Sequence, residues 1–283
     1  MKWKAHRVSR SMGGNVTLFI FLGLLSAFMV LPLVFVVVNA FKPLNELFVF
    51  PPKFYVINPT LNNFRQLFQI MNGAWMPFSR YLFNTVAITL IGTIGHILLA
   101  SLCAYSLSKI PFPGAGAVFQ VIVLSLMFSP VATTVPTYII MSKIGLVDTL
   151  WAVILPALQS SLGLYLIKQF LDTLPETLLE AARIDGAGEM RLFFRIVMPN
   201  LKPAWLTLGI LSIQSLWNIV SPYTYSEELK TLPQALSQIV SAGISRSGVG
   251  SAVALLMIVV PIFCFVVAQG NIIQTMSTSG MKD

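Results

Sequence analysis

The 283-residue sequence is poor in cysteine, histidine and charge, and each shortage excludes a class of site. Cys103 and Cys264 lie far apart inside apolar runs, so no disulfide framework and no zinc site is predicted. The two histidines, His6 and His96, have no further ligand at metal-binding spacing, so no metal site is predicted at all. His96 lies within an apolar run, where we expect a neutral ring with a local hydrogen bond. A functional intramembrane group is the alternative.

Motifs for catalysis and nucleotide binding are missing as well. The chain has no G-x-x-x-x-G-K-[ST] phosphate loop, no H-E-x-x-H and no partnered Ser, His and Asp set. We therefore predict no catalytic residue, no cofactor bound by this chain and no enzymatic activity. The net charge of +8 is not accompanied by stacking aromatic residues along basic runs, so no nucleic-acid partner is expected.

Apolar residues dominate instead. They make up 56% of the chain, charged residues only 10%, and the mean hydropathy is +0.80. Several apolar runs approach the ~20 residues that a helix needs to cross a bilayer, and lipid leaves a helix as the form that satisfies its own backbone. We predict an all-α polytopic membrane bundle, residues 1–283 forming one transmembrane domain. Its six spans are expected near 16–38, 82–108, 117–141, 149–170, 203–222 and 250–270.

The positive charges set the predicted topology. Lys2, Lys4, Arg7 and Arg10 precede the first span, which places the N-terminus in the cytoplasm. Six spans return the C-terminus to the same side, so both termini of this cell-membrane protein are expected to be cytoplasmic. Prolines interrupt the third, fourth and sixth spans and predict kinks there (Pro130, Pro136, Pro156 and Pro261).

Residues 171–202, between spans 4 and 5, form a charge-rich region among apolar runs. Thr173 and Glu176 predict a helix start, Gly186 and Gly188 a helix end, and Arg183 is expected to pair with Glu180. The region is longer than the 2–8 residues of an ordinary connection between bundled helices, which favours a cytoplasmic docking hairpin over a mere connector.

Polar residues inside the spans are candidates for a solute path. Gln214, Trp217 and Asn218 are spaced to share one helical face, and Thr133 lies in the third span. Hydrogen bonding between packed helices is the equal alternative for such residues.

Several motifs together resemble one family. Glu180-Ala181-Ala182, followed by Gly186, Ile196 and Pro199, resembles the EAA signature of permease subunits in binding-protein-dependent ABC importers, although Met198 replaces its usual leucine. The extension to Asp185-Gly186-Ala187 is similar to the carbohydrate branch, the maltose-transporter type. So are segments along most of the chain (Phe50 to Lys53, Tyr81 to Thr85, Ala104 to Lys109, Phe112 to Gly114, Trp217-Asn218, Pro222 and Thr231 to Pro233).

The resemblance implies a permease subunit that carries a carbohydrate, especially an oligosaccharide, and couples its passage to a separate ATPase. The expected partners are a homologous second permease, an ABC ATPase dimer that uses ATP, an extracytoplasmic solute-binding protein and membrane lipid. A permease for another solute and a self-sufficient secondary transporter are the alternatives. The identity of the sugar, and the choice of permease that holds its main site, stay open. The implied coupling residues are Glu180, Ala181, Ala182, Asp185, Gly186, Ala187, Gly188 and Pro199.

The C-terminal tail is the last candidate site. In permeases that resemble this branch, a tail of this length reaches the ATPase subunits, which implies contacts for Ser277, Ser279, Gly280 and Met281. A frayed, passive terminus is the alternative.

Overall fold

The structure is a computed structural model that describes residues 12–73, 76–241, 243 and 246–279, and every regular element within these ranges is a helix. The chain divides into two compact units. One comprises residues 1–69 and 242–255, and the other comprises residues 70–241 and 256–283.

The first unit contains α1 (Met12–Ala40), α2 (Leu44–Leu47), most of α3 (Asn62–Asn72) and the first turns of α14 (Ser247–Ser279). The amide of Asn63 fastens α3 to the end of α1, donating to the carbonyls of Ala40 (2.9 Å) and Lys42 (2.8 Å). A Cβ at Gly248 would lie 2.4 Å from Asn63 Oδ1, so glycine lets α14 approach α3 closely here. Apolar side chains along α1 are exposed, as expected for a helix that meets lipid.

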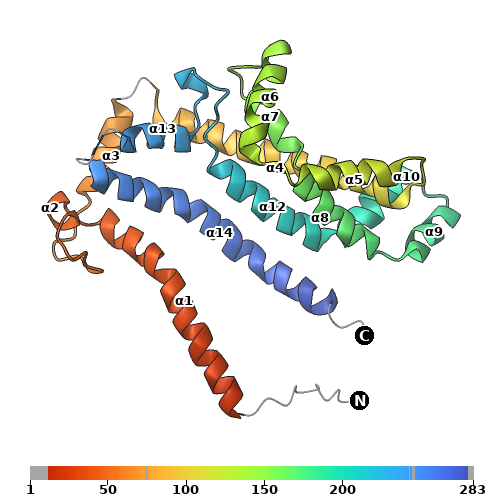
Figure 1. Ribbon diagram of the computed structural model, residues 1–283, viewed down its shortest axis with the longest axis horizontal. Helices are drawn as coiled ribbons and strands as arrows, with labels where there is room; N and C mark the ends of the chain where they lie inside the picture. The colour runs from red at the N-terminus through yellow and green to blue at the C-terminus, as the bar shows by residue number, and fades with distance from the viewer. Residues whose placement is uncertain (1–11, 74–75, 242, 244–245, 280–283) are drawn as a thin grey trace. The chain divides into compact units, whose positions relative to one another are not determined.

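In the second unit, α4 (Phe78–Lys109) is the central helix. α7 (Trp151–Leu158), α8 (Ser161–Asp172) and α12 (Lys202–Trp217) pack against it (Figure 1), and α13 (Leu232–Val240) contacts it as well. His96 of α4 is buried and its Nδ1 lies 3.1 Å from the carbonyl oxygen of Leu158, where α7 ends. The predicted local hydrogen bond of His96 is therefore confirmed, and it satisfies a carbonyl exposed by the break between α7 and α8.

Four described helices are long and apolar enough to cross a membrane, at residues 13–40, 78–109, 151–172 and 247–267. A fifth span results if residues 189–200 and 202–217, which are bent by 76°, count as one. Helix α12 ends at Trp217, before the predicted end of the fifth span at residue 222.

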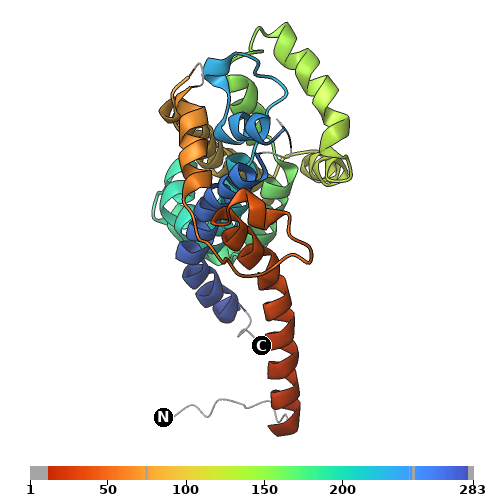
Figure 2. The same ribbon diagram turned by 90° about the vertical axis from the view of Figure 1, so that its left-hand side faces the viewer.

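The predicted third span, 117–141, is two helices rather than one kinked helix. They are α5 (Ala115–Ser125) and α6 (Pro130–Lys143), which run in different directions in Figures 1 and 2. Pro130 stands in the first turn of α6 and the hydroxyl of Ser129 accepts a hydrogen bond from the Val131 N–H (3.4 Å). Proline in a first turn and a serine cap are signals of a helix start, which accounts for the break.

Candidate functional site

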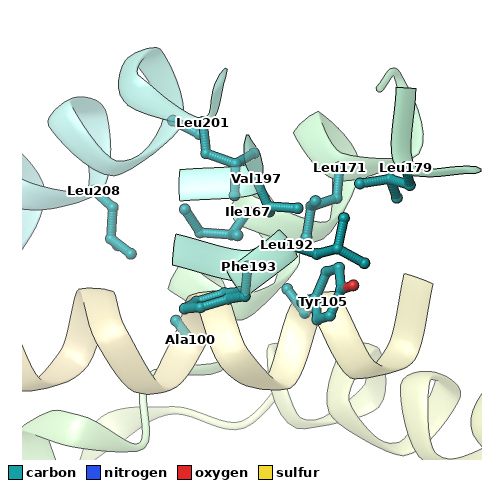
Figure 3. Close-up of a cluster of buried hydrophobic side chains, with 12 residues drawn as sticks. Ala100, Tyr105, Ile167, Leu171, Leu179, Leu192, Phe193, Val197, Leu201 and Leu208 are labelled. Atoms are coloured by element: carbon teal, nitrogen blue, oxygen red, sulfur yellow. The ribbon is translucent and has the colours of Figure 1, made fainter. Parts of the chain in front are cut away.

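The charge-rich region folds into a compact helical hairpin. It contains α9 (Glu176–Ile184), α10 (Glu189–Leu192), a π-helix (Phe193–Val197) and α11 (Met198–Asn200), which leads into α12. Its inner side chains join α4, α8 and α12 in one apolar cluster (Figure 3), which we call the hairpin base. The base comprises Ala100, Ala104, Tyr105, Ile167, Leu171, Leu179, Leu192, Phe193, Val197, Leu201, Ala204 and Leu208, all buried.

Polar contacts close the edge of the hairpin base. Asp172, at the end of α8, accepts hydrogen bonds from Ser108 (2.7 Å) and from Lys168 (2.8 Å). Lys109, the last residue of α4, donates to the carbonyl of Leu174 (2.9 Å). The C-terminal ends of α4 and α8 are therefore tied to each other and to the segment that precedes α9.

Glu189 joins three helices of this region. Its carboxylate accepts a hydrogen bond from the hydroxyl of Tyr105 on α4 and another from Arg183 Nε on α9 (3.1 Å). The Tyr105 hydroxyl, together with Arg183, holds the pKa of Glu189 below its usual value. The expected pairing of Arg183 with Glu180 was wrong, because the turn at Gly186 brings Glu189 back beside Arg183.

Gly186 ends α9 in a left-handed conformation, with φ of +78°. The Gly186 N–H donates to the Arg183 carbonyl and the Ala187 N–H to the Ala182 carbonyl (both 3.0 Å), the paired hydrogen bonds of a Schellman motif. The predicted helix end is confirmed. Gly188 has φ of −72° and precedes α10 in extended backbone, so only Gly186 requires glycine for its conformation.

The expected start of α9 was wrong in detail. Thr173 donates its hydroxyl backwards to the Phe170 carbonyl (2.7 Å), and the helix begins after Pro175 without a side-chain cap. Helix α8 extends through Asp172, so the Thr173 hydroxyl bonds to a carbonyl at the end of α8 rather than to an N–H at the start of α9.

The outer surface of the hairpin combines small, charged and apolar groups. Among the residues named from the sequence, Glu180, Ala181, Asp185, Gly186, Gly188 and Pro199 are exposed, while Ala182 and Ala187 are half-buried. Four large apolar side chains lie exposed on the same hairpin, namely Leu178 (42%), Ile184 (86%), Met190 (68%) and Phe194 (52%). These four were not among the site residues predicted from the sequence, although apolar residues inside a charged region were the available signal.

The candidate path residues on α12 do not share one environment. Gln214 and Asn218 are exposed, and the Asn218 amide donates to the backbone carbonyl of Gln214 (3.0 Å). Trp217 is buried and donates to the carbonyl of Met257 on α14 (3.1 Å). Gln214 lines a cavity of about 230 Å³, whose other walls are Ile210, Ile213, Pro261, Ile262, Cys264 and Phe265.

The remaining candidates are only partly described. Thr133 is exposed on α6. Ser277 and Ser279 belong to the last turns of α14, whereas Gly280 and Met281 lie outside the described residues.

Comparison with known proteins identifies the family to which this architecture belongs. The family described as "Binding-protein-dependent transport system inner membrane component" matches residues 11–278. The chain is 31% identical to Protein LplC of Bacillus subtilis over 70% of this chain, but the match spans only 65% of LplC. It is 28% identical to the arabinooligosaccharides transport system permease protein AraQ of Halalkalibacterium halodurans, over 89% of this chain and 91% of AraQ.

A solved structure shares the fold. It is a chain of a bacterial ABC transporter involved in the import of the acidic polysaccharide alginate, with a TM-score of 0.78 and 19% identity. The superposition covers 95% of this chain and 99% of the other. The helices described above are thus those of a membrane permease, and the chain belongs to the family of binding-protein-dependent transport system inner membrane components.

Proposed function

We propose that this chain is a permease subunit of an ABC importer for carbohydrates, most specifically for oligosaccharides. The observation that carries the proposal is the hairpin of α9 and α10, which has a buried apolar base and an exposed apolar surface at Ile184 and Met190. The solute class is supported by AraQ and by the alginate importer, whose names specify oligosaccharide and polysaccharide transport.

The hairpin surface docks on a separate ATPase, which binds and hydrolyses ATP. Exposed large apolar side chains on a soluble loop are the usual mark of a protein interface, and Ile184 is 86% exposed. Ala181 is exposed and allows close approach of a partner, while Ala182 and Ala187 pack against the hairpin base. Glu180 and Asp185 add polar contacts at the rim. A displacement of the hairpin by the ATPase passes through the hairpin base into α4, α8 and α12.

The six-span topology is part of the same proposal. Helices α5 and α6 together fill the third position, and α10, α11 and α12 lead into the fifth. Both termini and the hairpin then face the cytoplasm, and a homologous second permease with a solute-binding protein completes the importer. The cavity at Gln214 is the contribution of this chain to the solute path, with Asn218 beside it and Thr133 on α6, while Trp217 serves packing. The end of α14 supplies the tail contact with the ATPase.

The docking role can be tested with two substitutions on α9. Ile184→Ser removes an exposed group and should leave the permease folded, yet the ATPase should no longer copurify with it and uptake should fall. Thr177→Ser, at another exposed position of the same helix, is the matched control and should retain both. Wild-type ATPase recovery and uptake with Ile184→Ser would refute the docking surface.

The solute class requires its own measurement. Proteoliposomes that contain the intact importer and its binding protein should take up labelled arabinan or uronan oligosaccharides with ATP inside. Uptake of a peptide or an amino acid, with no uptake of any oligosaccharide, would favour the alternative permease function.

A further inference from the structure

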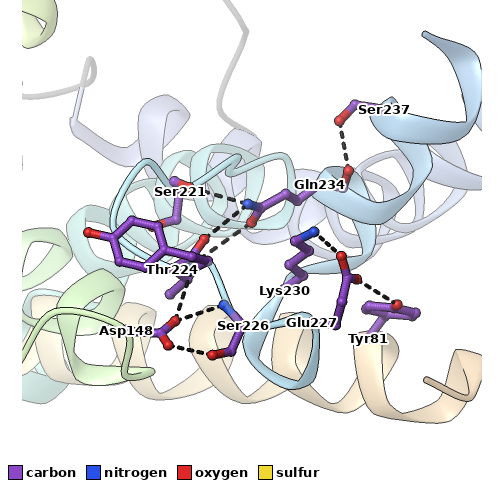
Figure 4. Close-up of polar contacts among 10 residues, drawn as sticks. Tyr81, Asp148, Ser221, Thr224, Ser226, Glu227, Lys230, Gln234 and Ser237 are labelled. Carbon is purple, nitrogen blue, oxygen red and sulfur yellow. Dashed lines mark hydrogen bonds and ion pairs between the residues drawn. The ribbon is translucent and has the colours of Figure 1, made fainter. Parts of the chain in front are cut away.

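The loop of residues 221–231, between α12 and α13, is fixed firmly to its surroundings (Figure 4). On one side Asp148 accepts hydrogen bonds from the backbone N–H groups of Tyr225 (2.8 Å) and Ser226 (3.0 Å), and from the Ser226 hydroxyl. Asp148 itself has φ of +61°, and its N–H donates to the Tyr223 carbonyl (2.9 Å). The loop and residue 148 are thus bonded to each other in both directions.

The start of α4 holds the other side of the loop. The buried amide of Asn84 donates to the carbonyls of Glu228 (2.8 Å) and Lys230 (3.0 Å), and Arg80 Nε also donates to Glu228 (3.2 Å). Figure 4 shows Glu227 between Tyr81 and Lys230, which both contact its carboxylate. Motion of the loop would break several directional hydrogen bonds at once, so its exposed side chains are held in place.

Three tyrosines cluster here, Tyr223 and Tyr225 of this fixed loop and Tyr138 of α6, and we call them the tyrosine platform. Tyr225 is 53% exposed, Tyr138 of α6 is 41% exposed, and their hydroxyl oxygens are 3.3 Å apart. The rings of Tyr138 and Tyr223 stack with centroids 6.5 Å apart, and the Tyr223 hydroxyl donates to the Thr134 carbonyl (3.3 Å). Two exposed tyrosines therefore bring their hydroxyls together, and the stacked ring of Tyr223 and the hydrogen-bonded loop support them.

We propose that the tyrosine platform binds a sugar ring of the transported oligosaccharide, an inference that rests on the proposed function. Sugar rings present faces of C–H groups edged by hydroxyls, which match an aromatic face next to phenol hydroxyls. Tyrosine offers a large amphipathic contact with little side-chain entropy to lose, and the fixed loop reduces the cost further. In the six-span topology this loop faces outward, where a sugar chain arrives.

The test compares variants in the complete importer, reconstituted with its binding protein and supplied with labelled arabinan and uronan oligosaccharides of different length. Tyr225→Ala should lower uptake at subsaturating sugar about fivefold, because the aromatic contact is lost. Tyr225→Phe and Tyr225→Trp keep a ring and should stay within about twofold of wild type. Tyr55→Ala removes a tyrosine of similar exposure (59%) from another loop and should have no effect.

Each outcome decides the proposal. It is overturned if Tyr225→Ala imports like wild type, or if Tyr225→Phe is as impaired as Tyr225→Ala. The proposal is also overturned if Tyr225→Ala weakens binding of the sugar-free binding protein to the importer as much as it lowers uptake. That result would assign the surface to protein docking. If wild type imports none of the oligosaccharides, the proposed function itself has failed. If Tyr225→Ala does not assemble, uptake by Tyr138→Ala is compared with uptake by Tyr225→Trp, and the same outcomes apply.

Discussion

The two ends of α4 carry two differently built attachments. At the C-terminal end, Tyr105 lies in the apolar hairpin base, while Ser108 and Lys109 close its edge. At the N-terminal end, Arg80 and Asn84 hold the 221–231 loop through hydrogen bonds. With 32 residues, α4 is about 48 Å long, so one rigid element joins both.

The difference in chemistry implies a difference in mechanics. Apolar burial has no preferred direction, so the hairpin can shift with its base while its side chains stay out of water. Hydrogen bonds require particular distances and angles, so the 221–231 loop keeps its position or loses its contacts outright. We infer that the hairpin end of α4 accommodates motion, whereas the loop end fixes a surface.

The largest effect is expected at Gly186. Gly186→Leu places a side chain at φ of +78° and projects it into the open space beside α9. Strain of about 1–2 kcal/mol leaves the protein inserted, but the added side chain blocks the proposed ATPase contact, so uptake should be abolished. Gly145→Leu, at φ of +72° and likewise facing open space, carries the same strain outside the hairpin, so it is the control and should transport normally. Western blots of membranes and uptake assays measure both, and normal uptake by Gly186→Leu would contradict the coupling role.

Two neighbouring leucines lie on opposite sides of the hairpin, one in its buried base and one on its exposed surface. Leu179 is fully buried and Leu178 is 42% exposed. Leu179→Ala should destabilise the detergent-solubilised protein by about 3 kcal/mol, because it leaves a cavity in the hairpin base. Leu178→Ala should change stability by less than about 0.5 kcal/mol and act only on ATPase recovery. Thermal unfolding followed by size-exclusion chromatography distinguishes the two, and equal stability losses would contradict the two-sided hairpin.

The helix end at Gly186 could be predicted from the sequence, whereas the hydrogen bonds of the 221–231 loop could not. Gly186 could be identified because a helix end with glycine is a local signal, and the apolar runs revealed α1, α4 and α14 for the same reason. The contacts of Glu189 with Tyr105, and of Asn84 with Lys230, join positions far apart in the chain. No spacing rule reports such pairs.

Local competition explains the other differences. Pro130 lies within an apolar run and is predicted to kink one helix. Because Ser129 precedes it and caps α6, the same proline stands in the first turn of a new helix. Thr173 is predicted to cap α9, yet its hydroxyl donates to the Phe170 carbonyl of the preceding helix instead. Trp217 and Gln214 have suitable spacing for one helical face, but burial against α14 separates them. In each case the observed structure depends on contacts with other parts of the chain, which the local sequence does not reveal.

A smaller effect is expected at the other end of α4. Asn84→Leu removes the two hydrogen bonds to Glu228 and Lys230 and leaves both carbonyls without this donor. The loss should be about 2 kcal/mol. Asn218→Leu, which removes one hydrogen bond at an exposed position, should cost less than about 0.5 kcal/mol. Urea unfolding of the solubilised protein measures both, and an Asn84→Leu variant as stable as wild type would show that the loop is held elsewhere.

The smallest effect concerns Asp148 and depends on pH. The Ser226 hydroxyl and the backbone N–H groups of Ser226 and Tyr225 hold the pKa of Asp148 below the usual value of an aspartate. A carboxyl group with a lowered pKa in the folded state stabilises the protein above its unfolded pKa, and this stabilisation is lost as the pH falls through the folded pKa. Asp148→Asn keeps the size of the side chain, and asparagine tolerates φ of +61°, but the charge is gone.

Wild type should therefore unfold at a slightly higher temperature than Asp148→Asn at pH 7 and at pH 5, by the same margin. The margin should shrink below about pH 4, where the carboxyl group of the unfolded chain takes up a proton that the folded protein still excludes. Asp185→Asn, which removes an exposed carboxylate of the hairpin, is the control for the loss of one negative charge. A margin that stays constant down to pH 3 would mean that the ionised form of Asp148 does not hold the loop. In that case the tyrosine platform would depend on α4 alone for its rigidity.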